Sequence, residues 1–367
     1  MSIILLILYF LALLLVFYLL ARVCTRYFVD SLELTARKLN LSEDIAGATL
    51  MAFGGSAPEF LIVIITLIHP GNHANFGAGT IVGSAIFNIL VVVGVAAIIH
   101  TSQLSWKPVV RDVVFYVAAI IALFLVFQDS QVFWFEALAL LALYVAYLFM
   151  LQTWQKFLPK IDKEILLDEL SDHVEVGEKR MEKRTNIFWK FLSFLDQVLE
   201  KVFINLDKHP KSCVYVFIES LIAIALLSWA LVEIAIRMSH IINIPEAFIA
   251  LTVVAVGTSI PDIIAASFMA KRGCGGMAIA DALGSNIFDI LFGFGLPWLV
   301  YTVITGKALK VSVENLHGSV LLLLATVIMI FLLLLLRHFK IGRSVGWLLI
   351  ACYAGYIAYS ILEILAL

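Results

Sequence analysis

Phe53-Gly-Gly-Ser-Ala-Pro-Glu59 and Val256-Gly-Thr-Ser-Ile-Pro-Asp262 are two matching stretches that place small residues, a proline and a carboxylate inside otherwise apolar sequence. Further along each half comes a second matching pair, Gly83-Ser-Ala-Ile-Phe-Asn-Ile-Leu90 and Gly284-Ser-Asn-Ile-Phe-Asp-Ile-Leu291. The chain is therefore duplicated internally, and its polar residues are concentrated at the repeated positions. This pattern predicts an ion-binding site inside a membrane.

The composition around these stretches is that of a polytopic membrane protein. Of the 367 residues, 62% are hydrophobic and 14% are charged, whereas ordinary soluble domains are about 25% charged. The formal net charge is -2, and basic residues form no patch away from the apolar spans, so nucleic acid is not expected as a partner. The four cysteines are widely spaced without a CxxC pair, so they predict neither a disulfide framework nor a zinc site.

Apolar runs long enough to cross about 30 Å of hydrocarbon predict an all-α polytopic membrane protein with ten transmembrane helices. The predicted helices lie near 3–21, 41–68, 76–100, 109–127, 132–151, 213–237, 244–270, 277–304, 317–336 and 344–365. The predicted domains are a first five-helix repeat (1–151), a hydrophilic loop (152–212) and a second five-helix repeat (213–367).

The basic residues predict the orientation of these helices. All but three of the 25 Lys and Arg residues fall on one predicted face, and the exceptions are Arg237, Lys307 and Lys310. By the positive-inside rule that face, with the central loop, is cytoplasmic and both termini are extracytoplasmic. Because five is an odd number, the second half enters the membrane from the opposite side, which makes the duplication an inverted repeat. We expect an integral protein of the plasma or inner membrane.

The central loop holds one further pattern. Apolar residues between Ile187 and Phe203 recur at helical spacing and predict an amphipathic helix. Two placements of this helix remain open, one flat on the membrane surface and one packed against the helix bundle.

The repeated acids are the main candidates for the ion site. An ionised carboxylate deep in hydrocarbon is costly, so Glu59, Asp262 and Asp289 should face the bundle interior and meet cations there. Each has a polar neighbour three or four residues away, which places both side chains on one helix face. In the first half, the amide Asn88 stands at the position that Asp289 has in the second. The pairs are Ser56 with Glu59, Ser259 with Asp262, Ser84 with Asn88, and Ser285 with Asp289.

The two prolines add backbone oxygens to this set. Pro58 and Pro261 lack the amide hydrogen that would bond the carbonyl four residues earlier, so the carbonyls of Gly54 and Gly257 are expected to be free as cation ligands. An all-oxygen site suits calcium or sodium and disfavours zinc or copper. One divalent ion among three acids leaves one negative charge unmatched, so a monovalent cation or a proton is expected as well.

Asp281 lies outside the matched set. It falls four residues before Ser285 and eight before Asp289, roughly on one helix stripe, but its counterpart in the first half is Thr80. Both a residue of the ion pathway and a buried structural acid remain open for it.

Together, the stretches 54–59 and 79–88 of the first half and 257–262 and 284–289 of the second resemble the two alpha-repeats of the sodium/calcium exchanger superfamily. The potassium-dependent sodium/calcium exchanger branch is the most similar, because it also carries an acid at the place of Asp289. The five-plus-five layout extends the resemblance over nearly the whole chain.

The resemblance implies a secondary active antiporter rather than an enzyme, with calcium, sodium and in this branch potassium as transported ions and no cofactor. It implies that Glu59 and Asp262 are the central calcium ligands, that the second, third, seventh and eighth helices form overlapping sites, and that the first and sixth helices slide to switch access. The complete set of candidate ligands is Glu59, Asp262, Asp289, Asn88, Ser56, Ser84, Thr258, Ser259, Ser285, Gly54 and Gly257.

Two other functions share part of this pattern. A proton/calcium exchanger of the same superfamily differs in its driving ion, and the sodium dependence of calcium flux separates the two. An intramembrane protease would belong to a different class, but Ser56 has no helix-embedded histidine to act as its base. The partners expected are therefore inorganic cations and the lipid bilayer, and the oligomeric state is left open.

Overall fold

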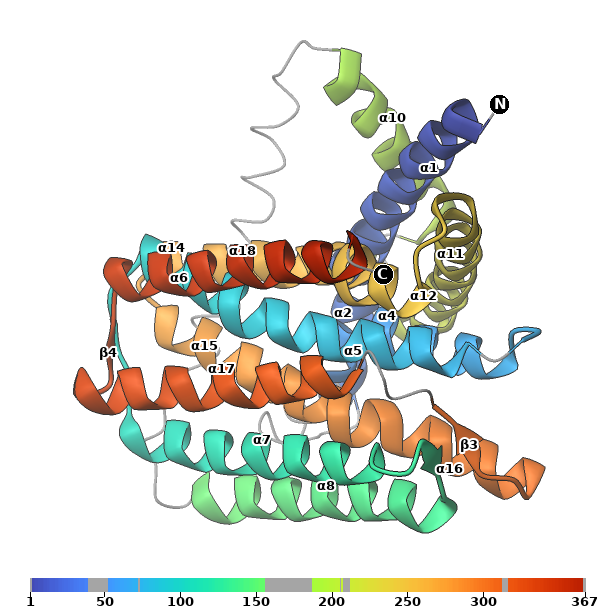
Figure 1. The fold of residues 1–367 in the computed structure, drawn as a ribbon. Coiled ribbons are helices and arrows are strands. Elements are labelled where there is room, and N and C mark those ends of the chain that lie inside the picture. The colour runs from blue at the N-terminus through green and yellow to red at the C-terminus, as the bar shows by residue number, and fades with distance from the viewer. Residues whose placement is uncertain are drawn as a thin grey trace.

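The computed structural model describes residues 2–38, 52–71, 73–155, 187–204, 206, 212–311 and 316–365. It is a bundle of helices, most of which run side by side across the molecule (Figure 1). Helices are the expected form here, because in hydrocarbon each backbone amide and carbonyl must find a partner within its own segment.

The two halves are built from similar but not identical series of elements. The first half has α1 (Ser2–Val23), η1 (Cys24–Phe28), α2 (Val29–Lys38), α4 (Ala52–Ile68), α5 (Ala74–Phe87), η3 (Asn88–Val92), α6 (Val93–Ile99), α7 (Trp106–Val126) and α8 (Trp134–Gln155). The second half has α11 (Cys213–Ile242), α12 (Glu246–Ile249), η5 (Ala250–Val254), α13 (Ala255–Thr258), α14 (Ile260–Lys271), α15 (Gly275–Phe288), η6 (Asp289–Gly293), α16 (Phe294–Thr305), α17 (Leu316–Leu336) and α18 (Arg343–Leu365). The η elements are π-helical turns within longer helices.

The predicted order of spans is confirmed, while the number ten is not reached within the described ranges. Eight helices there are long and apolar enough to cross a membrane, and one bent pair makes nine. The shorter apolar helix α4 corresponds to the predicted span 41–68, whose first part lies outside the described residues.

Two predicted spans differ from the structure. The first was expected to end at residue 21, but η1 and α2 continue it to Lys38. The span expected over 244–270 is broken at Ser259 and bends there by 41°. Ser259 leaves the helical conformation two residues before Pro261, which stands in the first turn of α14, whereas Pro58 lies inside the unbroken helix α4.

Two short β-ribbons mark the opposite ends of the bundle. We call the end where α8 and α14 finish the loop face and the end where α4 and α16 finish the termini face, on the left and right of Figure 1. At the loop face β1 (Ser102–Gln103) pairs with β4 (Lys340–Ile341), and at the termini face β2 (Gln131–Val132) pairs with β3 (Leu309–Lys310). Each ribbon is antiparallel and joins one half of the chain to the other.

The buried apolar residues form two clusters. The larger one, which we call the frame, is built mainly from α5 to α8 and α14 to α18. The smaller one joins α1 and α11 to one side of α4 and to η5, and we call it the α1–α11 unit. The α1–α11 unit therefore has its own core, separate from that of the frame.

The predicted amphipathic helix is present as α10 (Ile187–Val202), which lies beside α1 in Figure 1. Asp196 accepts a hydrogen bond at 2.8 Å from Arg22 of α1, and Phe203 stacks on Tyr27 with ring centroids 4.3 Å apart. The opposite side of α10 is apolar and exposed at Phe191, Phe194, Val198 and Val202. The helix thus contacts the bundle through one face and leaves its apolar face uncovered by the described residues.

Candidate functional site

The repeated polar residues lie where the regular helices are disturbed. Asn88 begins the π-helical turn η3, and its counterpart Asp289 begins η6 at the same place in the second half. Such turns are rare and occur frequently at functional sites, because the extra residue redirects the side chains. Ser259 stands at the break between α13 and α14.

Most of the candidate side chains are buried. The buried members are Ser56, Glu59, Ser84, Asn88, Thr258, Ser259 and Asp289. Asp262 and Ser285 are half-buried. The structure therefore places the whole predicted set inside the protein, with the two partly accessible residues both in the second half.

The polar contacts at this site connect the two repeats. Glu59 of α4 has Thr258 as a hydrogen-bond partner, and Asp289 has Ser56. The hydrogen-bond partner of Asp262 is the side chain of Asn88. Each contact joins a residue of one half to a residue of the other, so the site lies at the interface between the repeats.

The three carboxylates also act on one another electrostatically. The charge of Glu59 acts on Asp262 and on Asp289, and the charge of Asp262 acts on Asp289. Like charges this close are unfavourable unless a cation or a proton compensates them. The arrangement therefore calls for bound positive charge.

Several buried oxygens at the site lack hydrogen-bond partners among the described residues. They are Glu59 Oε2, Asp289 Oδ1, Asn88 Oδ1 and Ser259 Oγ. An unpaired buried polar atom costs roughly 1–3 kcal/mol, so native structures rarely contain several together without a ligand. These oxygens are of the types that calcium and sodium prefer.

Within the same ranges, no three carboxylate, imidazole or thiol groups converge closely enough to hold one metal ion. A cation bound in this conformation would therefore need hydroxyl or amide oxygens to complete its ligands. Ser56, Thr258 and Asn88 lie at the acids and carry such oxygens.

The two glycine carbonyls, which the prolines are expected to leave free, differ from each other. The carbonyl of Gly54 accepts a hydrogen bond from Cys24 Sγ at 3.3 Å, because η1 of the long first helix packs beside α4. At the break after α13, the backbone N–H of Ser259 donates to the carbonyl of Ala255 at 3.2 Å. The prediction of a carbonyl without a partner is therefore wrong for Gly54 and stays a prediction for Gly257.

Asn286 is a buried polar residue that the sequence reasoning missed. Its Oδ1 accepts a hydrogen bond from Asn88 Nδ2 at 3.2 Å, and its Nδ2 donates to Tyr116 OH at 2.9 Å and to the carbonyl of Ala85 at 3.2 Å. Ala85 is the residue at the equivalent position of the first half, so Asn286 lies close to the axis that relates the repeats. The available signal was the difference between Gly-Ser-Asn in the second half and Gly-Ser-Ala in the first.

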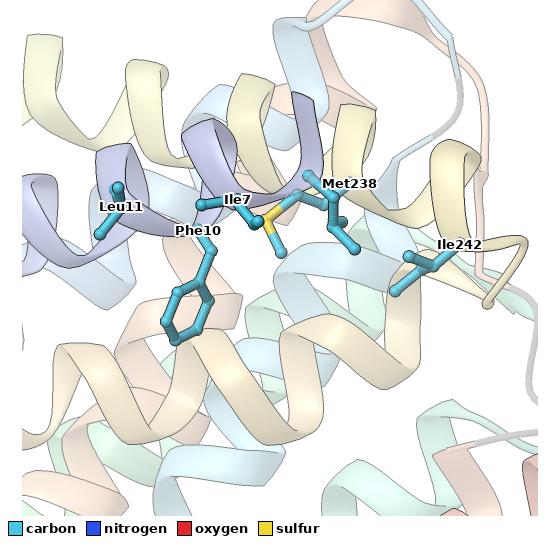
Figure 2. A pocket seen from close by; sticks show the side chains of 6 residues that line it. Ile7, Phe10, Leu11, Met238 and Ile242 are labelled. Carbon is cyan, nitrogen blue, oxygen red and sulfur yellow. The ribbon is translucent and has the colours of Figure 1, made fainter. Parts of the chain in front are cut away.

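A separate apolar groove lies between α1 and α11. Figure 2 shows Ile7, Phe10 and Leu11 on one side of it and Met238 and Ile242 on the other, and its volume is about 300 Å³. Its lining side chains carry no oxygen, so this groove is not a second cation site.

A helical membrane protein whose inverted repeats meet around buried acids and hydroxyls has the architecture of a secondary transporter for cations. The sodium/calcium exchanger protein family matches residues 2–152 and 212–362, and the chain belongs to that family. It is an antiporter of the sodium/calcium exchanger superfamily.

Individual relatives agree with this assignment. Sodium/potassium/calcium exchanger 2 of Gallus gallus is 27% identical, over 94% of this chain and 75% of its own length. Sodium/potassium/calcium exchanger 5 of Homo sapiens is 28% identical, over 98% of this chain and 83% of its own.

Solved structures show the same fold. The sodium-calcium exchanger NCX_Mj, soaked with Na+ and Sr2+, aligns with a TM-score of 0.55 at 26% identity, covering 98% of this chain and 99% of its own. The H+/Ca2+ exchanger CAX aligns with a TM-score of 0.65 over 97% of this chain and 82% of its own, but at 15% identity it shows the fold alone.

Replacing Asn286 with alanine is expected to leave the amide of Asn88 without its partner and to weaken cation binding. The lost hydrogen bonds correspond to about 1–3 kcal/mol. Tyr116→Phe removes only one of these contacts and should have a smaller effect. The measurement is the apparent KM for calcium in reconstituted vesicles, and an unchanged KM in Asn286→Ala would contradict this positioning role.

Proposed function

We propose that this chain exchanges sodium for calcium across a membrane, with potassium moving together with calcium, by alternating access to the site between the repeats. The observation that carries the proposal is a pair of buried carboxylate oxygens, Glu59 Oε2 and Asp289 Oδ1, that have no partner in the described part of the chain and lie beside hydroxyl groups of the opposite repeat.

The proposed ligands divide by charge. Glu59 and Asp262 face each other as the central calcium ligands, with Asp289 as the third acid. Neutral oxygens complete the coordination, and they come from Ser56, Ser84, Asn88, Thr258, Ser259 and Ser285. The carbonyl of Gly257 belongs to the proposed set as well, and that of Gly54 joins it when cation binding displaces Cys24 Sγ.

The coupling follows from charge. Three acids carry three negative charges, and one calcium ion neutralises two of them, so a monovalent cation is needed for full compensation. Sodium ions compete for the same oxygens, and because calcium and sodium cannot occupy them together, the release of one ion permits the binding of the other. Mutually exclusive occupancy makes the two fluxes interdependent.

The proposed potassium dependence is based on the third acid, Asp289. Its counterpart in the first half is the neutral Asn88, so the third acid is the main chemical difference between the two halves of the site. The curated relatives described above are named sodium/potassium/calcium exchangers. A carboxylate at this position provides the extra negative charge that a potassium ion would balance.

The proposed switch of access uses the α1–α11 unit. That unit has its own core, distinct from the core of the frame, so it can move as a body against the frame. In the present conformation α11 packs along α4, whereas α1 meets the broken helix of the second half at the short segment α13. The two repeats are therefore in different arrangements, as alternating access requires.

We further propose that the loop face is cytoplasmic, in a plasma or inner membrane, with both chain ends on the other side and segment 152–212 as a cytoplasmic loop between the repeats 1–151 and 213–367. The support is the distribution of Lys and Arg along the sequence, in which all but three fall on the predicted face that includes the central segment.

Calcium uptake into proteoliposomes tests the proposed function. Vesicles loaded with sodium are diluted into labelled calcium with or without external potassium, and an ionophore clamps the voltage. We expect uptake that requires the outward sodium gradient and is stimulated by potassium, and we expect Asp289→Asn to lose the stimulation because the extra negative charge is gone.

The same uptake measurement distinguishes sodium/calcium exchange from proton/calcium exchange and tests the role of potassium. Uptake driven by a pH gradient and indifferent to sodium would identify a proton/calcium exchanger and contradict the proposal. Uptake by the unmodified chain that ignores potassium would remove potassium from the proposed reaction while leaving sodium/calcium exchange in place.

A further inference from the structure

Along one stripe of the helix that carries the third acid, Asp289, the side chains become steadily less exposed. Asp281 is exposed, Ser285 one turn further is half-buried, and Asp289 two turns further is buried. All three lie in one membrane-spanning helix, Gly275–Thr305. An opening therefore narrows along this stripe from the loop face towards the three acids.

The first half has no such opening. Thr80, the counterpart of Asp281, is fully buried and donates its hydroxyl proton to the carbonyl of Phe76 at 3.0 Å. Ser84 and Asn88, the counterparts of Ser285 and Asp289, are buried too. The site is thus accessible along the second repeat and closed along the first.

The opening lies within the protein rather than on its lipid-facing side. Asp281 is exposed although its helix, α15, packs against α4, α7 and α14, so its side chain lies at a crevice between helices. Tyr147 OH of α8 comes within 4.0 Å of the position that a Cβ on Gly284 would take. The same hydroxyl donates a hydrogen bond to Asp112, so polar side chains of α7 and α8 lie beside this stripe.

The two charged side chains in this polar group, Arg111 and Asp112, neutralise each other. Arg111 donates to both carboxylate oxygens of Asp112, at 2.8 and 3.1 Å, and both side chains are nearly buried. Asp281 has no such cationic partner among the residues that the structure describes. Its charge acts on Asp262, so the crevice and the central site are electrostatically continuous.

We propose that Asp281 is a cation-capture residue of the loop-face entrance, where a partly hydrated calcium or sodium ion binds before it passes to Asp262. This inference rests on the proposed exchange function. Asp281 would not belong to the central ligand set, because it is exposed and separated from Asp289 by two helical turns.

The inference gives the two entrances different properties. A carboxylate in a narrow crevice concentrates cations near it, since the surrounding protein focuses its field. The equivalent position towards the termini face carries Thr80, which has no charge to do this. The apparent affinity for calcium should therefore depend on Asp281 from the loop face alone.

The test measures calcium KM separately from each face in membrane vesicles of the two orientations, whose sidedness is determined by tryptic cleavage at the Lys and Arg residues of segment 152–212. For Asp281→Asn we expect the KM from the loop face to rise about 10-fold, with the KM from the termini face unchanged. Because the effect is electrostatic, it should shrink when inert salt is raised. Asp281→Glu retains the charge and should behave as the unmodified chain does.

Asp129→Asn is the matched control, because Asp129 is an exposed acid at the termini face, where it accepts a hydrogen bond from the backbone of Gln131 that an amide oxygen can also accept. It should leave both KM values unchanged. An unchanged KM for Asp281→Asn from the loop face would overturn the inference, and so would an equal rise from both faces, which would indicate a central ligand or a folding defect. A chain that shows no sodium-dependent calcium flux even when unmodified would overturn the proposed function and this inference with it.

Discussion

Calcium flux through the Glu59→Gln variant is expected to fall by about 100-fold or more. Glu59 is buried, one of its oxygens has no partner among the described residues, and its charge acts on both other acids. Glutamine keeps the size of the side chain but removes one of the three negative charges of the proposed calcium site. Losing one partner of a buried ion pair costs about 3–5 kcal/mol, which is the origin of the expected factor.

The measurement is sodium-driven uptake of labelled calcium by the reconstituted variant. Glu136→Gln is the matched control, because this acid caps the start of α8 by accepting the backbone N–H of Phe133 at 2.8 Å, and an amide oxygen can accept the same bond. The control should transport normally. Sodium-driven flux that persists in Glu59→Gln at the unmodified rate would show that the central site has been placed wrongly.

Replacing Gly83 with alanine is expected to destabilise the packing between the two halves. A Cβ at Gly83 would lie 2.3 Å from the backbone carbonyl oxygen of Leu251 and 2.8 Å from Cβ of Ala255. The carbonyl belongs to the helix backbone, so no side-chain rotation relieves the clash and α5 must move away from η5. Overpacking of this kind costs roughly 1–3 kcal/mol or more, and Ser84 of the site would be displaced with it.

Thermal unfolding in detergent, followed through the seven tryptophans, measures this effect. We expect the melting temperature of Gly83→Ala to drop by several degrees. Gly318→Ala is the control, since a Cβ at that position in α17 would meet nothing within 4 Å, and alanine is the better helix former. Equal melting temperatures for Gly83→Ala and the unmodified chain would show that α5 and η5 are not so tightly packed.

The sequence predicted the helices well because hydrophobic length is a strong local signal. Apolar runs gave the order of the spans, and helical spacing of apolar residues gave α10. The inverted repeat followed from counting, since five spans in each half require opposite entry. The two β-ribbons had no comparable signal, because each strand is only two residues long and its partner lies in the other half.

The break at Ser259 could not be predicted from the motif, since both halves carry Ser and Pro at equivalent positions. In the first half the helix continues through Pro58, and in the second it bends. The difference depends on tertiary contacts. At Gly257, two residues before the break, the Phe17 ring of α1 occupies the space that a Cβ would take.

The burial of the candidate acids and hydroxyls inside the bundle was predictable, because matching polar residues in both halves of an apolar chain should face the protein interior. Their pairing across the repeats depends on three-dimensional arrangement, and so does the bridging role of Asn286. The sequence also left the role of Asp281 open, because exposure along a helix stripe depends on which neighbours pack against it.

The two β-ribbons also constrain how the chain can fold during synthesis. Ser102 and Gln103 pair with Ile341 and Lys340, and Gln131 and Val132 pair with Lys310 and Leu309. After the first half has inserted into the membrane, its strands β1 and β2 therefore remain unpaired. They can pair only when β3 and β4 of the second half have been synthesised. Closure of the frame is consequently a late step of biogenesis, and a nascent chain interrupted between the halves has no complete core.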